Sequence, residues 1–502
     1  MPHLHKALTL CETLSQTIQK PTIMFFKKSI LLICCILLGQ TLLAQSKKEK
    51  LSEIMKTFHK YNMFDGAVLV AENGRIIYKD AFGLANREWN IPNSTDTKFM
   101  IGSISKPLTA TLSLILVQKG LINLDKTIED YLTEFKNKPA SKVTIRQLLN
   151  HTSGIPNYDI IKDFFPKISR QSFSRENYVK VYRDSALAFE PGSRYMYSSW
   201  GYFTLGYIIE KVTGKSYAQA LKDEIFNKLN MQNSGSYLHT EIVSKRASGY
   251  DYGFGNYISA DFRDQSNTMG TGDIYTTVED LFKFNIAIAN NSLLSKELTK
   301  EMFTPGIRPA RYGYGWFNQN FKFTTTDSIT ANYHLGSTEG FIAFLIRIPE
   351  TESMAVILCN SAPTDFFGII KNLLKVLYNK PVVLKEPIHK KMETIIADFN
   401  AEKAVTEYKK MKIDTAHFYA EWLQMYYLGE KLFSLKRYDD AKIIAENNVL
   451  EFPERDYVAL SMANIYLALN RKEDAIKFYK KTLLLNPDSE EAKNRLKELQ
   501  PN

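Results

Sequence analysis

Runs of β-forming residues near the two ends of one long region constrain the fold of this chain most strongly. From Gly66 to Gly83, apolar and polar residues alternate around Asn73-Gly74, a strong short signal for a hairpin. Far downstream, residues 341–348 and 354–359 form two more apolar, β-rich runs. We therefore predict a single antiparallel sheet that is assembled from both ends of this region.

Mainly helical patterns fill the interval between these strands. Residues 108–119 end at Gly120, and residues 203–212 end at Gly214, as expected for glycine at a helix C-terminus. The first of these patterns is apolar on nearly every side, which predicts a helix buried on all faces. The expected fold class is α/β (α+β), with an antiparallel sheet flanked by helices and an inserted helical subdomain.

The C-terminal part of the chain is repetitive. Pro381 and Pro387 bracket a predicted linker at 381–388. Beyond it, Asp440-Ala441 recurs 34 residues later as Asp474-Ala475. This period resembles that of the tetratricopeptide repeat, so we predict an all-α repeat domain at 389–502, with an ordinary helical bundle as the alternative. Because two clear repeats are few for a stable array, we expect them to pack against the preceding domain or against a protein partner.

The first 45 residues have the order of a secretory signal. Lys27-Lys28 precede the apolar stretch at 30–43, and Ala44 is a small residue suited to cleavage. Met24 is the expected start. Since the stretch is too short to span a bilayer comfortably, we expect no membrane span after signal removal and an exported protein, periplasmic or extracellular. The domain that follows is predicted at 50–380.

Composition and charge narrow the range of partners. The 44% hydrophobic and 24% charged fractions are ordinary for a folded protein, and the net charge of +10 comes without a dense basic stripe. We therefore expect no nucleic-acid partner. Cys11, Cys34 and Cys35 would leave with the signal, and Cys359 lies in an apolar run. Neither a metal nor another cofactor is expected, because no ligand cluster has suitable spacing.

The most informative chemical pattern is Ser103-Ile104-Ser105-Lys106. Positions i and i+3 share one face of a helix, so the amine of Lys106 is within reach of the hydroxyl of Ser103. A serine attacks a carbonyl only when a neighbour accepts its proton, and a lysine does so once its pKa is lowered. The pattern predicts a serine nucleophile with its base beside it.

Two further elements are weak when taken singly. Tyr197-Ser198-Ser199 lies just before a predicted helix, and alone it indicates no more than an aromatic loop. In His334-Leu335-Gly336-Ser337, which leads into a strand, we expect the glycine to leave space for a substrate to lie against the backbone. Alone, His334 is better interpreted as a histidine that serves only the structure.

Together and in this order, the three elements resemble the penicillin-recognising serine hydrolases. The chain is most similar to the branch that contains class C β-lactamases, D-alanyl-D-alanine carboxypeptidases, D-amino-acid peptidases and related esterases. Accompanying strings that fit lie at residues 148–154, 270–273, 277–281 and 312–316. The resemblance implies a β-lactamase-like fold for the domain at 50–380.

The resemblance also implies roles for individual residues. Ser103 would attack the carbonyl and become acylated, while Lys106 and Tyr197 would handle its proton; which of these two is the base stays open. The backbone N–H groups of Ser103 and Ser337 would form the oxyanion hole. His334 would orient Tyr197, or would bind a substrate carboxylate when protonated.

One departure from the family's pattern bears on the substrate. The asparagine of the family's Tyr-x-Asn element is Ser199 here, a shorter side chain that cannot both donate and accept as an amide does. Hydrolysis of bulky amides or β-lactams is therefore less expected than acylation itself. We expect a secreted serine hydrolase for D-alanyl peptides, small amides or esters. The alternative is a catalytically weak or inactive protein that binds cell-wall ligands or β-lactams while its repeats recruit a partner.

Overall fold

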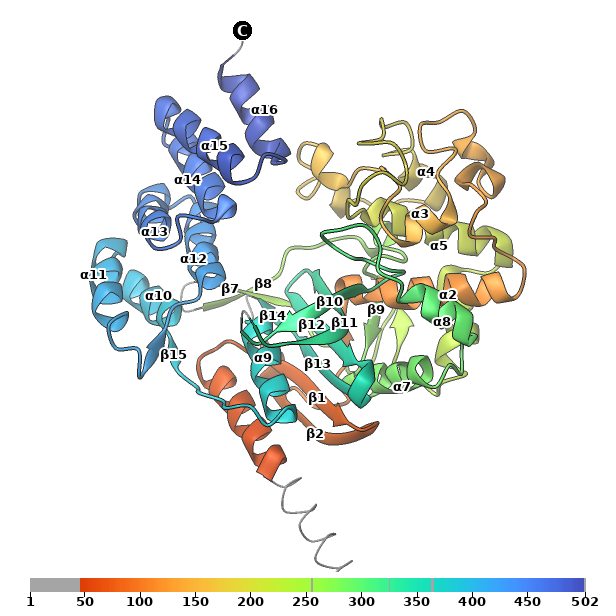
Figure 1. Ribbon diagram of the computed structural model, residues 1–502, viewed down its shortest axis with the longest axis horizontal. Coiled ribbons are helices and arrows are strands. Elements are labelled where there is room, and N and C mark those ends of the chain that lie inside the picture. The colour runs from red at the N-terminus through yellow and green to blue at the C-terminus, as the bar shows by residue number, and fades with distance from the viewer. Residues whose placement is uncertain (1–45, 254–255, 325, 363–364, 501–502) are drawn as a thin grey trace, which may run out of the picture. The chain divides into compact units, whose positions relative to one another are not determined.

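The computed structural model describes residues 46–253, 256–324, 326–362 and 365–500. The predicted signal region at 1–45 lies outside these residues. Contacts along the chain define two units, Met1–Glu53 and Ile54–Asn502. The elements below belong to the second unit (Figure 1).

An antiparallel sheet forms the centre of the fold. Within the described residues its six strands follow the order β10 (Phe317–Lys322), β11 (Ser328–Thr338), β12 (Phe341–Ile348), β13 (Ser353–Cys359), β1 (Gly66–Glu72) and β2 (Arg75–Phe82). In the pairing of β1 with β13, Gly66 lies opposite Cys359, so the two ends of the region meet inside the sheet. This confirms the predicted antiparallel sheet.

The turn between β1 and β2 shows why the sequence forms a hairpin there. Glu72 pairs with Arg75, which leaves Asn73 and Gly74 as a two-residue loop. Both loop residues have positive φ, 50° and 69°, as a tight hairpin turn requires. Asparagine and glycine tolerate this conformation at little cost, so the local sequence fixes the register of the hairpin.

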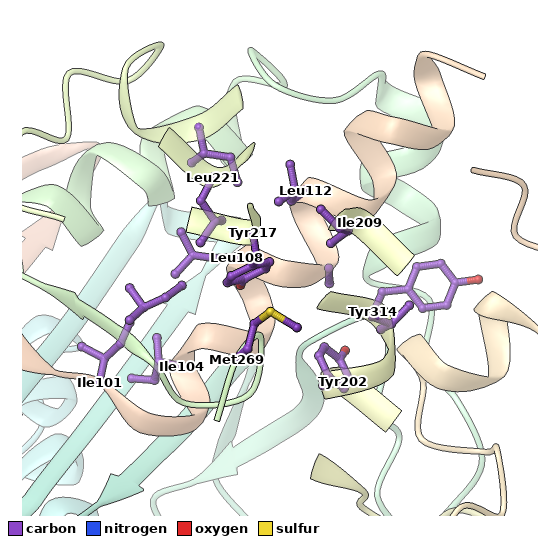
Figure 2. Close-up of a cluster of buried hydrophobic side chains, with 14 of the residues drawn as sticks. Ile101, Ile104, Leu108, Leu112, Tyr202, Ile209, Tyr217, Leu221, Met269 and Tyr314 are labelled. Carbon is purple, nitrogen blue, oxygen red and sulfur yellow. The ribbon is translucent and has the colours of Figure 1, made fainter. Parts of the chain in front are cut away.

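Helix α2 (Ser105–Gln118) is the buried helix predicted from the sequence. It begins three residues earlier than the apolar pattern, and Pro107 falls in its first turn, where a proline removes no helical hydrogen bond. Leu108 and Leu112 of α2 pack among side chains of α5 (Ser199–Thr213) and α6 (Tyr217–Leu221) (Figure 2). The start of α2 is therefore held within the core.

The remaining elements complete the domain. Helices α7 (Val278–Ala289) and α9 (Phe366–Leu377) pack against the sheet at β13. The short helices are α3 (Ile145–Leu149), α4 (Arg175–Val179) and α8 (Lys296–Met302). The short strands are β3 (Leu84–Asn86), β4 (Ile91–Pro92), β5 (Phe99–Met100), β6 (Gly235–Ser236), β7 (Tyr250–Gly253), β8 (Asn256–Ser259), β9 (Ile274–Thr276) and β14 (Ser361–Ala362).

The C-terminal region is helical, as predicted, and has a hydrophobic cluster of its own between Ile388 and Ala492. Its helices are α10 (Ile388–Asp398), α11 (Ala401–Met411), α12 (Trp422–Ser434), α13 (Tyr438–Glu451), α14 (Asp456–Ala468), α15 (Lys472–Leu485) and α16 (Glu490–Leu499). The short strands β15 (Glu386–Pro387) and β16 (Phe418–Tyr419) pair in parallel. Helices α12 and α14 each have 13 residues, and α13 and α15 each have 14. Helices α12 and α14 begin at Trp422 and Asp456, and α13 and α15 begin at Tyr438 and Lys472, so the equivalent helices are 34 residues apart. The assignment to tetratricopeptide repeats stays a prediction.

None of the helices in the described ranges is both long enough and apolar enough to cross a membrane.

Candidate active site

Ser103 lies in a 3-10 turn, η1 (Gly102–Ile104), that leads directly into α2. Gly102 has a φ of +48°, a left-handed conformation that glycine adopts readily. The first N–H groups of a helix have no partners within it, and they carry the positive end of the helix dipole. The hydroxyl of Ser103 is therefore placed where negative charge on a nearby oxygen is stabilised.

The amine of Lys106 is completely buried beside Ser103. Its Nζ lies 3.0 Å from Ser103 Oγ and 3.0 Å from the carbonyl oxygen of Thr271. Burial lowers the pKa of Lys106 well below its usual 10.5; the charge of Arg263 lowers it further, and that of Asp273 acts in the opposite direction. Burial thus favours the neutral amine of Lys106 to a lower pH than in an exposed lysine.

Tyr197 converges on the same point. Lys106 Nζ lies 4.7 Å from the centroid of its ring, and its phenol is hydrogen-bonded to Ser103. Burial raises the pKa of Tyr197 well above 10, while the bond to Ser103 acts the other way. The structure thus brings Ser103, Lys106 and Tyr197 together, with the phenol protonated at neutral pH.

The loop that carries Tyr197 is fixed on both sides. Ser198 caps α5 by accepting a hydrogen bond from Gly201 N at 3.1 Å. Its own backbone N–H donates to Nδ1 of His151 at 3.2 Å, and the His151 ring lies 4.3 Å from that of Tyr197, centroid to centroid. Because Nδ1 accepts this bond and burial lowers the pKa of His151 well below 6.5, His151 is neutral and orients the tyrosine loop.

The end of β11 touches the nucleophile turn through backbone atoms. A Cβ on Gly336 would lie 1.9 Å from the carbonyl oxygen of Ile101, and one on Gly102 would lie 2.7 Å from Ser337 N. The backbone N–H of Ser337 is therefore placed next to the turn that holds Ser103. The missing side chain of Gly336 makes room for the backbone of Ile101, and the expected space for a substrate along this strand stays a prediction.

His334 has its two ring nitrogens occupied within the protein. Its Nε2 lies 2.9 Å from the hydroxyl of Tyr312, and its Nδ1 lies 2.6 Å from the carbonyl oxygen of Leu335. Burial lowers the pKa of His334 to about 3, so the ring is neutral near pH 7. The predicted role of a protonated His334 in binding a carboxylate is therefore wrong. Its ring centroid lies 6.3 Å from that of Tyr197, so it supports the tyrosine by packing.

Ser199 is the first residue of α5, two positions after Tyr197. Its backbone N–H donates to the side-chain Oδ1 of Asn157 at 3.1 Å. The side-chain amide of Asn157, from a loop distant in sequence, therefore lies beside Ser199 at the start of α5. Sequence reasoning missed Asn157, since nothing in its neighbourhood marks it as a partner of this element.

Three more residues near the site were not assigned from the sequence. Asp273 accepts from Gly270 N at 2.9 Å and from Ser236, and so shapes the loop that presents the Thr271 carbonyl to Lys106. Asp273 and Tyr312 lie in the strings at 270–273 and 312–316, whose resemblance to the family was the one signal that could have indicated these two residues. Arg263 lies in no such string, and its sequence context carries no signal.

Within the ranges that the structure describes, no group of three or more His, Cys, Asp or Glu side chains is arranged to hold a metal ion.

The central antiparallel sheet, with a serine and a buried lysine at the start of a core helix, defines a serine hydrolase architecture of the β-lactamase type. The chain belongs to the Beta-lactamase family, whose model matches residues 49–380. This confirms the resemblance noted from the sequence motifs.

Individual relatives agree with this assignment. A penicillin-binding protein of Bacillus subtilis (strain 168) is 29% identical over 407 residues, which cover 74% of this chain and 88% of the relative. The teichoic acid D-alanine hydrolase of Staphylococcus aureus is 28% identical over 278 residues, which cover 54% of this chain and 66% of that enzyme. The crystal structure of the D-amino acid amidase of Ochrobactrum anthropi, with L-phenylalanine amide, superposes with a TM-score of 0.55 at 25% identity, covering 67% of this chain and 99% of the amidase.

Proposed function

We propose that this protein is an exported serine hydrolase that forms an acyl-enzyme on Ser103 and cleaves D-alanyl peptides, small amides or esters. The observation that carries the proposal is the buried amine of Lys106, 3.0 Å from Ser103 Oγ. No carboxylate among the described residues hydrogen-bonds this amine. A neutral lysine next to a serine hydroxyl has the geometry and the protonation state of a general base.

The proton path follows from the two shifted pKa values. As Ser103 Oγ bonds to the substrate carbonyl carbon, its proton passes to Nζ of Lys106, whose lowered pKa favours the neutral amine that can accept it. Tyr197 is a protonated phenol, so it donates its proton to the leaving group as the carbonyl-to-leaving-group bond breaks, and it regains one from Lys106. In deacylation, water replaces the leaving group and the same transfers run in reverse.

The developing oxyanion needs donors at the nucleophile. We assign this role to the backbone N–H groups of Ser103 and Ser337, which the contact between Gly102 and β11 brings to one place. Removal of one such donor typically costs about 3 kcal/mol of transition-state stabilisation.

The names of two relatives support the proposed substrates. One is a teichoic acid D-alanine hydrolase and another is a D-amino acid amidase. Both names describe hydrolases that act on derivatives of D-amino acids, D-alanine in one and a D-amino acid amide in the other. We therefore propose a D-amino acyl ester or amide as the first substrate class to assay.

A second candidate function is weak or absent catalysis with binding of cell-wall ligands or β-lactams. Ser199 favours it, because the family's second element loses its amide there. The amide of Asn157, which accepts from Ser199 N, argues for the hydrolase instead, since its remaining N–H groups lie beside the same helix start.

Burst kinetics separate the two functions. With p-nitrophenyl acetate, the hydrolase releases one equivalent of nitrophenol rapidly and then turns over, and Ser103→Ala loses both phases. Ser113→Ala is the matched control, because Ser113 is a buried serine of α2 whose hydroxyl bonds the Thr109 carbonyl within the helix. Equal turnover by wild type and Ser103→Ala would defeat the assignment. A stable mass increase with penicillin would contradict a purely non-covalent binding protein.

Export and partner binding are separate parts of the proposal. A signal before Gln45 predicts that the exported chain starts near that residue, which the mass of the secreted protein measures. A full-length mass in the exported fraction would contradict cleavage. We further propose that the C-terminal helical repeats bind a protein partner, which crosslinking of the exported protein in intact cells tests.

A further inference from the structure

Arg263 is a cation held in a fixed place by side chains of the inserted region. Its Nε donates to Oδ1 of Asn267 at 3.2 Å. Its guanidinium carbon lies 5.6 Å from the ring centroid of Tyr158 and 5.8 Å from that of Phe165. The side chain is only 11% exposed. An arginine this enclosed, with aromatic rings beside it, is positioned for recognition, since a purely solubilising arginine would extend into solvent.

The terminal nitrogens of Arg263 remain available to a ligand. Of the five N–H donors of a guanidinium, one is used by Asn267. Oε1 of Glu339 forms a long ion pair with Nη1 at 3.8 Å, beyond hydrogen-bond distance, while Oε2 of the same carboxylate accepts a bond from Thr338. Nowhere in the described ranges does a protein acceptor hydrogen-bond Nη1 or Nη2. The enclosed charge is therefore only loosely compensated.

Two separate connections place this guanidinium at the active site. Glu339 follows Ser337 by two residues, just after β11 ends. On the other side, Tyr158 is adjacent to Asn157, which bonds the backbone of Ser199 at the start of α5. The charge of Arg263 also acts on Lys106, whose pKa it lowers. Arg263 thus lies between the end of β11 and the element that carries Tyr197.

We propose that Arg263 binds an anionic group on the leaving portion of the substrate. This inference rests on the proposed hydrolase function and names its substrate class. The leaving side is indicated because Tyr158 and Asn157 adjoin the Tyr197 element, and Tyr197 is the donor to the leaving group. Both ring nitrogens of His334 are occupied within the protein, so the charge offered to a substrate on this side comes from Arg263. The planar, paired N–H groups of arginine match a carboxylate or a phosphate.

Three esters with one acyl group test the proposal in the full-length protein. They are phenyl acetate, 3-acetoxybenzoate and 3-acetoxyphenyl phosphate, which differ in the charge of the leaving group. For the wild type we expect kcat/KM to be at least about tenfold higher for one of the anionic esters than for phenyl acetate. A preference for the benzoate identifies a carboxylate, and a preference for the phosphate ester identifies a phosphate.

The Arg263→Gln variant should reduce the ratio of kcat/KM for the anionic ester to that for phenyl acetate by about 10- to 100-fold, mainly through KM. Arg263→Lys should retain part of the preference. The ratio is the informative quantity, because any shift in the pKa of Lys106 affects both esters alike and cancels. Glu339→Gln should raise the ratio, since it removes the carboxylate that competes for the cation.

Arg170→Gln is the matched control. Arg170 is an exposed arginine that pairs with Asp261, and Asp261 lies two residues before Arg263 in the sequence. Because Arg170 is exposed to solvent, its loss should leave the ratio unchanged. An unchanged ratio in Arg263→Gln, with phenyl acetate still hydrolysed, would overturn this inference and leave the hydrolase function standing. Failure of the wild type to hydrolyse any of these esters or the D-amino acyl substrates would overturn both.

Discussion

Gly336 and Ile101 are in backbone contact so close that a methyl group on Gly336 would lie 1.9 Å from the carbonyl oxygen of Ile101. This contact sets the distance between β11 and the nucleophile turn. Gly336→Ala should therefore separate Ser337 from Ser103 and lower kcat by about 100-fold or more, the usual effect of losing an oxyanion donor. Steady-state kinetics with phenyl acetate measure this effect.

Gly429→Ala is the control for that substitution. Gly429 lies in α12, where a new Cβ would meet its nearest neighbour at an ordinary 3.8 Å. Because alanine favours a helix over glycine, this variant should be stabilised by up to about 1 kcal/mol without loss of turnover. Full activity in Gly336→Ala would show that β11 does not supply a donor.

Lys106→Arg should abolish turnover, since arginine keeps its charge and cannot accept the proton of Ser103. In the wild type, the lowered pKa of Lys106 means that the neutral amine is already present well below pH 10.5. The pH profile of kcat/KM should therefore reach its plateau well below that value. A profile that still rises steeply toward pH 10.5 would argue for an ordinary lysine.

Tyr197→Phe keeps the ring that packs on Lys106 and removes the phenol. General acid catalysis typically contributes about 10²- to 10⁴-fold, so kcat should fall within that range. The loss should be smaller for an ester whose leaving group is stable as an anion, because such a group needs no proton. Comparison of p-nitrophenyl acetate with an alkyl acetate measures the difference.

Tyr195→Phe is the matched control for this tyrosine. Tyr195 lies two residues earlier in the same segment, with its ring 6.1 Å from that of His151. Its loss should change kcat little. Equal losses in the two variants would assign the effect to the packing of the loop and would contradict a proton-donor role for Tyr197.

The raised pKa of Asp273 leads us to expect that the stability of the protein depends on pH. Burial, the largest influence, raises its pKa from 3.8 to about 6. The folded protein therefore favours the protonated carboxyl of Asp273. Its contribution to the free energy of unfolding is fully present below pH 3.8 and is lost as the pH rises through about 6. Asparagine can accept from Gly270 and donate to Ser236, so Asp273→Asn should be more stable than the wild type above that pH, by up to about 3 kcal/mol.

Denaturant unfolding at pH 4 and at pH 7.5 measures this effect. The advantage of Asp273→Asn should be present at the higher pH and small at the lower one. An advantage that is equal at both pH values would mean that the carboxylate is not penalised by burial.

The sequence allowed prediction of those features that depend on neighbouring residues. The Asn73-Gly74 hairpin, the buried helix that begins near Ser103, and the helical C-terminal region follow from local turn chemistry and periodicity. The spacing of Ser103 and Lys106 was also readable, since one helical turn brings them together. These features need no knowledge of how distant segments pack.

The features that were missed depend on distant contacts. Arg263 and Asn157 reach the site from loops, and neither loop has a periodic pattern. The carboxylate-binding role expected for His334 fails because burial, and after it the charge of Lys106, lower the pKa of the ring, while Tyr312 occupies its Nε2; none of these contacts is visible in a string of residues. The contact of Gly336 with Ile101 was missed for a similar reason, since Ile101 lies far away in sequence.

The pairing of β1 with β13 has a consequence for how the protein acquires activity. Since Gly66 is paired with Cys359, the sheet cannot close until nearly the whole domain has been synthesised. Ser103 is made early, but Ser337 of β11, which contacts the turn that holds Ser103, is made much later. A partly synthesised chain therefore carries Ser103 without the sheet that completes the site, so hydrolysis has to await the finished domain.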